Sequence, residues 1–481
     1  MGKIKAFLFN NTSTRQTIVK NTFWLFLGEI LGRILKFAVV LFATRALGVE
    51  RWGVFSYAIA FVSLTYIFAD IGINTFVTRE LSKEGADRYT YLSAALALKL
   101  LLLAASFIIS LLLIPQYGSN PLAFSIVVVI AVLNFSDSLR EFYLSINRAL
   151  LKMEREAYIK VGINVVTTAV GIVLLMTTPT PLSLGIAYMV GSVLGTIAAM
   201  AILPNELIAI KWNFPLSYIK IIFDFAWPFI ALTIFSTALV TIDSIMLGQI
   251  TSASQVGMYA AAQRIIQFLA IIPLYIGISL FPLLAKKESA GTASVAIFEK
   301  TMTIVLGLAL PIALGGFLLS GKIMTILFGS EFAPAGTVLA ILMVVIIADF
   351  AFIILNNIIY AKNLQKKFIL ATIIGLVLNI CLNIYLIPHY GAAGAAIATA
   401  TAQMLIMALN WIQLKRFFAF SVLPKLTRII AATAIMGAVI MCCNGLGLYF
   451  SLTVIIAIIS YAWVLYLFRE PSLGEITSLF K

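Results

Sequence analysis

Charged residues, histidine and cysteine are all scarce in this chain. Of its 481 residues, 11% are charged and 62% are hydrophobic, and there is a single histidine. Soluble domains carry about 25% charged residues, so the composition excludes an ordinary soluble protein. No nucleotide-binding loop, metal-ligand cluster or nucleophile–base spacing occurs in the loops, and we therefore expect no enzyme. The cysteines, Cys381, Cys442 and Cys443, lie in apolar segments without metal-ligand spacing and are interpreted as packing residues.

Long apolar runs dominate instead, with a mean hydropathy of +1.07. A membrane-spanning helix needs about 20 largely apolar residues. We predict an all-α polytopic membrane protein of about 14 spans. The expected spans are 21–46, 53–78, 91–114, 122–147, 157–178, 182–203, 219–247, 256–285, 301–328, 335–361, 366–387, 391–414, 425–443 and 448–468. The first run is too long and too charged for a signal peptide, so we expect it to be retained.

The basic residues indicate the orientation of these spans. About 25 of the 33 Lys and Arg residues fall in loops on the same side as the N-terminus, and cytoplasmic loops are the ones enriched in Lys and Arg. The sequence therefore predicts a multi-pass protein of the cell membrane with both termini in the cytoplasm. The net charge of +14 is explained by this bias, and we expect no nucleic-acid partner.

The first span carries three charges, Glu29, Arg33 and Lys36, on one helical stripe. A charge near the bilayer centre costs roughly 2.5–3.5 kcal/mol, so such a stripe normally faces a bundle interior or an aqueous cavity. This favours a transport pathway. The alternative is a Glu29–Arg33 pair at i, i+4 that only helps to pack the bundle.

Similar short motifs recur about 200 residues apart. Leu47-Gly48 ends the first span and Leu247-Gly248 ends the seventh, and Gly53 and Gly257 follow them. Six spans precede six in the same orientation, which indicates a parallel repeat with a pseudo-twofold axis along the membrane normal. We predict an N-lobe over 1–203, a C-lobe over 204–414, and two further helices with a cytoplasmic C-terminus over 415–481.

The motifs resemble a known family. Among them are Trp227-Pro228, Asp243-Ser244, Asn383 and Gly391-Ala392-Ala393-Gly394, and together the motifs are fairly specific for the superfamily. The chain is similar to Wzx-type oligosaccharide flippases, the polysaccharide-transporter branch of the multidrug/oligosaccharidyl-lipid/polysaccharide exporter superfamily. The resemblance covers essentially the whole chain and fits members with fourteen helices.

This resemblance implies that polyprenyl-pyrophosphate-linked oligosaccharide moves from the cytoplasmic to the outer leaflet as two six-helix lobes rock. Membrane lipids, and glycan polymerase or transferase machinery, are the partners it suggests. A flippase for the peptidoglycan lipid precursor and a cation-coupled drug exporter of the same superfamily stay open as alternatives.

Five embedded basic residues suit an anionic cargo, because Arg and Lys stabilise pyrophosphate in a low-dielectric cavity. They are Arg33, Lys36, Lys99, Arg140 and Arg264. Besides Arg33, three of them have structural alternatives. Lys99 can snorkel to the interface, Arg140 can pair with Asp137 and Glu141, and Arg264 can pair with Asp243.

Embedded acids are candidates for ion coupling or gating, through H⁺ or Na⁺. The candidates are Glu29, Asp70, Asp243 and Asp349. Asp349 has no basic residue within a helical turn, and a protonated packing residue is its alternative. Asp70 is followed by Gly72, which permits a bend, and is first interpreted as structural or conformational. No metal site and no other cofactor is expected.

Prolines interrupt three of the expected second-lobe helices, at Pro228, Pro273 and Pro311, and Gly315-Gly316 follows the last. Membrane helices tolerate such residues where neighbouring groups satisfy the loosened backbone. These positions are either flex points for alternating access or static kinks.

Overall fold

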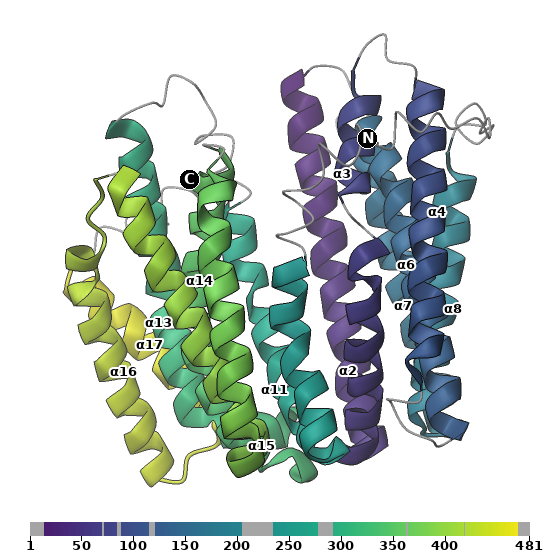
Figure 1. The fold of residues 1–481 in the computed structure, drawn as a ribbon. Coiled ribbons are helices and arrows are strands. Elements are labelled where there is room, and N and C mark those ends of the chain that lie inside the picture. Colours follow the sequence, from purple (N-terminus) through teal and green to yellow (C-terminus); the bar gives the residue numbers. More distant parts are fainter. Residues whose placement is uncertain are drawn as a thin grey trace, which may run out of the picture. The chain divides into compact units, whose positions relative to one another are not determined.

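The fold is entirely helical in the residues that the structure, a computed structural model, describes (Figure 1). These residues are 14–69, 72–83, 88–114, 121–203, 234–277, 292–361, 364–417 and 419–469. No strand occurs in these ranges. The expectation of an all-α protein is confirmed.

The chain divides into two compact units, Met1–Ile245 and Met246–Lys481. The helices of the first unit are α2 (Thr14–Tyr66), η1 (Ile67–Ala69), α3 (Ile73–Leu81), α4 (Arg88–Leu112), α6 (Pro121–Ala149), α7 (Met153–Thr177) and α8 (Pro181–Ala201). A helix over Ile234–Ile250 contains the boundary. Those of the second unit are α11 (Ala253–Leu269), α13 (Thr292–Phe328), η3 (Ser330–Phe332), α14 (Ala335–Ala361), α15 (Gln365–Phe417), η4 (Leu423–Leu426), α16 (Thr427–Gly445) and α17 (Phe450–Leu467).

Many of these helices are membrane spans. Within the described ranges, nine helices are long and apolar enough to cross a bilayer. One of them, Phe368–Phe417, has 50 residues, and at 1.5 Å per residue this is about two and a half times the thickness of a bilayer core. It therefore holds two crossings, as the expected spans 366–387 and 391–414 require. The protein is a multi-pass membrane protein.

Two glycines join consecutive spans without a long loop. α2 is broken at Gly48 (φ 73°, ψ 176°) and α15 at Gly391 (φ 54°, ψ −131°). Positive φ is strained for residues with a Cβ atom, so glycine is needed at both turns. At the second turn, the Gln255 side chain of α11 accepts a hydrogen bond of 2.8 Å from the Ala392 amide. This bond satisfies one backbone donor that the broken helix exposes.

The second expected span, 53–78, is wrong as a single helix. α2 ends at Tyr66, η1 follows, and α3 begins only at Ile73. The physical reason is Gly72, which precedes α3 in the left-handed region at φ 76° and cannot continue a right-handed helix. A bend near Gly72 is therefore confirmed, whereas Asp70 lies outside the described residues.

The prolines behave differently from one another. α11 ends at Leu269, and after Ala270 the chain is helical again over 271–277, so Pro273 lies in a short helix directly after a break. A break here is expected, because proline has no amide to bond the Leu269 carbonyl. Pro311 instead lies inside α13. Pro228, like most of the expected span 219–247, lies outside the described residues.

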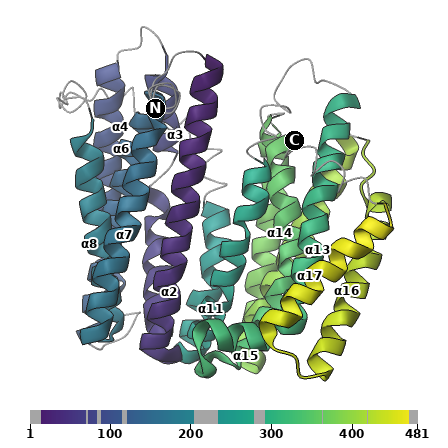
Figure 2. The same cartoon turned by 180° about the vertical axis from the view of Figure 1, so that it is seen from behind.

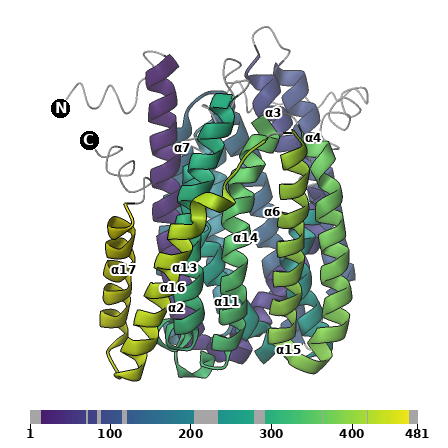
Figure 3. The ribbon, with the colours of Figure 1, turned by 90° about the vertical axis from the view of Figure 1, so that its left-hand side faces the viewer.

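Close packing of helix pairs forms the interior of each unit. In the first unit α2 packs against α7, and α6 packs against α8 (Figure 2). The buried ring of Trp52 stacks obliquely on Phe55. In the second unit α14 packs against α13 and α15, and α16 packs against α13 and α17 (Figure 3). These packed pairs hold the polar side chains described next.

Candidate functional site

A chain of ion pairs crosses three helices of the first unit and begins on α2. The Glu29 carboxylate accepts a hydrogen bond of 2.8 Å from Arg33 Nε, one helical turn away. Both side chains are partly exposed, and Lys36, less than one turn further along, is exposed. The Glu29–Arg33 pair that the sequence spacing indicates is thus present, but it is not isolated.

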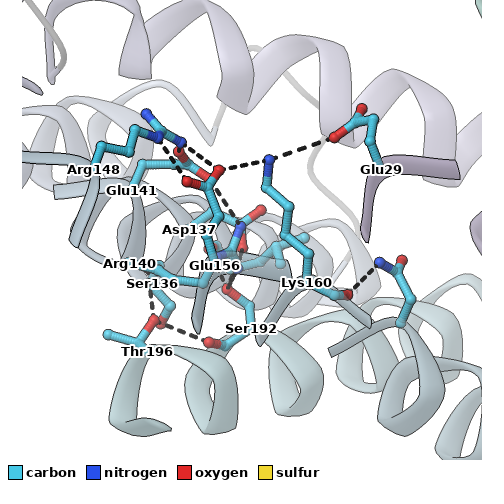
Figure 4. A network of polar contacts seen from close by, with 12 residues as sticks. Glu29, Ser136, Asp137, Arg140, Glu141, Arg148, Glu156, Lys160, Ser192 and Thr196 are labelled. Carbon is cyan, nitrogen blue, oxygen red and sulfur yellow. Dashed lines mark hydrogen bonds and ion pairs between the residues drawn. The ribbon is translucent and has the colours of Figure 1, made fainter. Parts of the chain in front are cut away.

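Lys160 on α7 links this pair to a second helix (Figure 4). Its Nζ atom lies 3.4 Å from Glu29 Oε2 and 2.9 Å from Glu156 Oε1. Glu156 lies one turn before Lys160, and its side chain is only 1% exposed. Lys160 therefore connects α2 to a carboxylate that has almost no access to water.

Arg148, near the end of α6, holds the other side of that carboxylate. Its Nε and Nη2 atoms each donate to Glu156 over 2.7 Å, and Nη2 also donates to Glu141 over 3.0 Å. The two parallel bonds to Glu156 have the fork geometry that makes Arg–carboxylate pairs strong. A buried carboxylate is tolerated only with such compensation, because its desolvation costs several kcal/mol.

Arg140 closes the series on α6 and reaches α8. It pairs with Asp137, lies 3.9 Å from Glu141, and donates to Ser192 Oγ over 3.3 Å. Ser192 itself donates to Asp137. Figure 4 shows these groups converging between the helices. The alternative of an ion-pair cluster around Arg140 thus matches the contacts that this side chain makes.

We call the eight residues of this series the charged network. Its members are Glu29, Arg33, Asp137, Arg140, Glu141, Arg148, Glu156 and Lys160. Four are basic and four are acidic, so its formal charge is zero. An anion that binds Arg33 or Arg140 therefore has to compete with carboxylates already in place.

Three of its members were not singled out by sequence reasoning: Arg148, Glu156 and Lys160. The last two lie at i, i+4 in α7, the spacing that places a Glu and a Lys on one helix face. The expected helix over 157–178 leaves Glu156 outside, whereas α7 begins at Met153. An earlier helix start would have revealed the pair.

The remaining candidates lie elsewhere. Lys99 on α4 is fully buried, which does not fit snorkelling to the interface. In the second unit Arg264 donates to Gln267 over 3.0 Å. Asp243 is fully buried in Ile234–Ile250, and its expected pair with Arg264 stays a prediction.

Asp349 is half-buried near the middle of α14, and among the described residues no basic side chain pairs with it. The same part of the chain contains no cluster of three or more His, Cys, Asp or Glu that could hold a metal ion.

Comparisons with known proteins identify the relatives of this chain. The model of the polysaccharide biosynthesis protein family matches residues 18–288. The chain is 25% identical over 385 residues to the probable low-salt glycan biosynthesis flippase Agl15 of Haloferax volcanii, covering 80% of each protein. It is 24% identical over 420 residues to the putative O-antigen transporter of Shigella flexneri, covering 82% of this chain and 97% of the relative.

A solved structure supports the fold. The lipid II flippase MurJ in an inward closed conformation matches with a TM-score of 0.76 at 18% identity, covering 95% of this chain and all of the other. The family model covers more than half of the 481 residues. The chain therefore belongs to the polysaccharide biosynthesis protein family, the polysaccharide-transporter branch of the multidrug/oligosaccharidyl-lipid/polysaccharide exporter superfamily.

Proposed function

We propose that this protein is a flippase that moves polyprenyl-pyrophosphate-linked oligosaccharide from the cytoplasmic to the outer leaflet of the cell membrane. The observation that carries the proposal is the likeness, over about four-fifths of the chain, to relatives named as a glycan flippase and an O-antigen transporter. The product would serve the assembly of a surface polysaccharide or another glycan. Polymerase or transferase machinery would then act on the translocated glycan.

Alternating access is the mechanism that we propose for this transport. Two lobes, 1–203 and 204–414, rock about a central site, with both termini in the cytoplasm and the helices of 415–481 attached to the second lobe. Asp243 and Asp349 are proposed to gate the site or couple it to H⁺ or Na⁺, with Glu29 and Asp70 as further candidates.

The embedded cations support the choice of an anionic cargo. A pyrophosphate leaving water needs charge-assisted hydrogen bonds, which Arg and Lys supply. Lys36 is the first choice because its side chain is exposed on the helix that carries Arg33. Arg33 and Arg140 are engaged with carboxylates, so they bind cargo only by exchanging partners. Lys99 and Arg264 are proposed as secondary contacts.

The test is translocation in proteoliposomes of a fluorescent polyprenyl-pyrophosphate oligosaccharide. The unmodified protein is compared with Lys36→Ala and Arg33→Ala at equal insertion. Arg416→Ala is the matched control, because Arg416 is an exposed cation in the last turn of α15. We expect both stripe variants to lose most of the translocation and the control to keep it.

Other outcomes would change the proposal. Unchanged translocation in both variants would mean that Arg33 and Lys36 only contribute to helix packing and do not bind cargo. Movement of the peptidoglycan lipid precursor alone, or drug efflux driven by a cation gradient without any lipid movement, would replace the proposed function by one of the two alternatives in the same superfamily.

A further inference from the structure

Pro311 leaves one backbone carbonyl of α13 without its helical partner. In an α-helix the carbonyl of residue i−4 accepts from the amide of residue i, and proline has no amide hydrogen. The proline lies inside α13, so the carbonyl concerned belongs to Gly307. In a bilayer no water replaces the missing donor, and such a group has to be satisfied by a neighbouring side chain or helix.

A tyrosine from the last helix supplies that donor. The Tyr461 hydroxyl on α17 donates to the Gly307 carbonyl over 2.6 Å. This bond joins residues 154 positions apart in the sequence. The backbone carbonyl that accepts from Tyr461 is therefore the same one that Pro311 frees.

Packing fixes the tyrosine in this position. The Tyr461 ring packs against a buried cluster formed by Leu319, Met436, Ile440 and Ala457, which come from α13, α16 and α17. Figure 3 shows these three helices side by side. The ring is thus held by the same apolar contacts that hold α17 on the unit.

Glycines allow α16 to lie close to α13 on both sides of the proline. A Cβ atom at Gly307 would lie 3.3 Å from Ile429 Cδ1, and one at Gly437 would lie 2.7 Å from Leu314 Cδ2. The Ile429 and Leu314 side chains would have to shift to make room for a side chain at these positions. The close approach of α16 supports the helix that carries Tyr461, because α16 also packs against α17.

We propose that Tyr461 replaces the backbone hydrogen bond that Pro311 removes, so that the docking of α17 controls the bend of α13 during transport. The transport part of this inference rests on the proposed function. In this proposal α16 and α17 act as a brace, meaning that they stabilise α13 at the position where Pro311 weakens it. Tyr461 acts as a positioning residue, and it acts through α13.

A double-mutant cycle tests the hydrogen bond itself. Tyr461→Phe, Pro311→Ala and the double variant are unfolded at equilibrium by SDS titration in mixed micelles. Interhelical hydrogen bonds in membrane proteins contribute about 0.6 kcal/mol on average, so Tyr461→Phe should lower the folding equilibrium constant roughly threefold. In the Pro311→Ala background the restored amide bonds Gly307, and the second substitution should have no effect.

Tyr466→Phe is the matched control, because Tyr466 is an exposed tyrosine on the same helix. An equal loss from Tyr461→Phe in both backgrounds, or an equal loss from Tyr466→Phe, would overturn the proposal.

The bend of α13 is measured separately by pulsed electron–electron double resonance, which gives the distance between two spin labels. The labels are attached at Lys300 and Lys322, two exposed positions on α13. The three native cysteines are first replaced. We expect Tyr461→Phe to broaden the distance distribution and Pro311→Ala to make it narrow with or without Tyr461. An unchanged distribution in Tyr461→Phe would refute control of the bend, even where the Pro311 variants do not fold.

A translocation assay distinguishes a failure of this inference from a failure of the proposed function. With the lipid-linked oligosaccharide, Tyr461→Phe should change the translocation rate at least about threefold, in proportion to the lost bond, and Pro311→Ala should remove that dependence. No translocation by the unmodified protein, together with coupling in the unfolding cycle, would reject the proposed function and keep the hydrogen bond. Normal translocation in Tyr461→Phe would reject the role of the brace in transport and keep the flippase.

Discussion

Glu156 is the member of the charged network whose loss should cost the most. It is the most buried of the eight residues, and it accepts from Arg148 and Lys160 on two different helices. Glu156→Gln keeps the size of the side chain and removes its charge. The two cations then remain close together without the carboxylate that separates them.

The magnitude follows from the bonds that change. Glu156 receives two bonds of 2.7 Å from Arg148 and lies 2.9 Å from Lys160. A hydrogen bond to a charged group is worth about 1.5–3 kcal/mol and a neutral one about 0.5–1.5, so roughly 1 kcal/mol is lost per bond. Arg148 and Lys160 are 30% and 28% exposed, and water recovers part of their solvation. We expect a net destabilisation of about 2 kcal/mol.

Equilibrium unfolding in mixed micelles measures this cost. Glu141→Gln serves as the matched control, because Glu141 is 34% exposed and lies 3.0 Å from Arg148. Its loss should cost less than about 1 kcal/mol. A Glu156→Gln protein as stable as the unmodified one, or less destabilised than Glu141→Gln, would refute the view that the network holds a buried charge in place.

Three further outcomes follow from the contacts and backbone angles. Gly391→Ala should destabilise the protein by about 2 kcal/mol or more, because φ is 54° and the new Cβ would lie 2.6 Å from Gln255 Oε1. Gly162→Ala is the control and should not destabilise the protein, because no atom lies within 4 Å of the new Cβ. Thermal unfolding in detergent compares the two variants. Thr180→Ala should cost about 1 kcal/mol in the same assay, because the Thr180 side chain accepts from the Ser183 amide at the start of α8; a smaller loss than that of Gly162→Ala would contradict this cap. Lys36→Ala should lower translocation of the lipid-linked glycan about tenfold while leaving thermal unfolding unchanged, since Lys36 is exposed; a loss of stability equal to that of Gly391→Ala would contradict a role in cargo binding.

Most of the helices could be predicted from the sequence because hydropathy alone defines them. The expected span 335–361 coincides with α14, and 425–443 lies within two residues of α16 at each end. In a bilayer every backbone polar group has to be satisfied within the segment, so a long apolar run has few alternatives to a helix. This constraint removes most of the ambiguity between helix, strand and loop that an apolar run has in a soluble protein.

Local backbone geometry is harder to predict. The break between α2 and α3 depends on the left-handed conformation of Gly72, whereas many other glycines of the chain, such as Gly162, continue a helix. Hydropathy does not distinguish the two uses of glycine. Likewise, Pro273 lies directly after a break in its span, whereas Pro311 lies within the unbroken α13, although each interrupts a similar apolar run.

The partners of the charged residues could be predicted only within a single helix. Spacing indicates the Glu29–Arg33 and Asp137–Arg140 pairs, because i, i+3 and i, i+4 residues share a helix face. The bond from Lys160 to Glu29 joins residues 131 positions apart, and no local pattern encodes it. The candidate site therefore emerges from the packing of α2 against α7.

This packing also changes the meaning of the basic residues. Arg148 and Lys160 both count toward the excess of Lys and Arg from which the sequence predicts the orientation of the chain, and that rule concerns the sequence while its helices insert. In the folded protein each of these two cations forms an ion pair with the Glu156 carboxylate, which offsets part of their positive charge. The positive charge used to predict the orientation is therefore not the charge that the proposed cargo would meet at the first unit. A cation can direct insertion and later be neutralised by a carboxylate from another helix turn. The count of +14 consequently overstates the field near the charged network, where four cations face four acids. Under the proposed function, recognition of an anionic cargo there would depend on which ion pairs open, and the number of basic residues would not decide it.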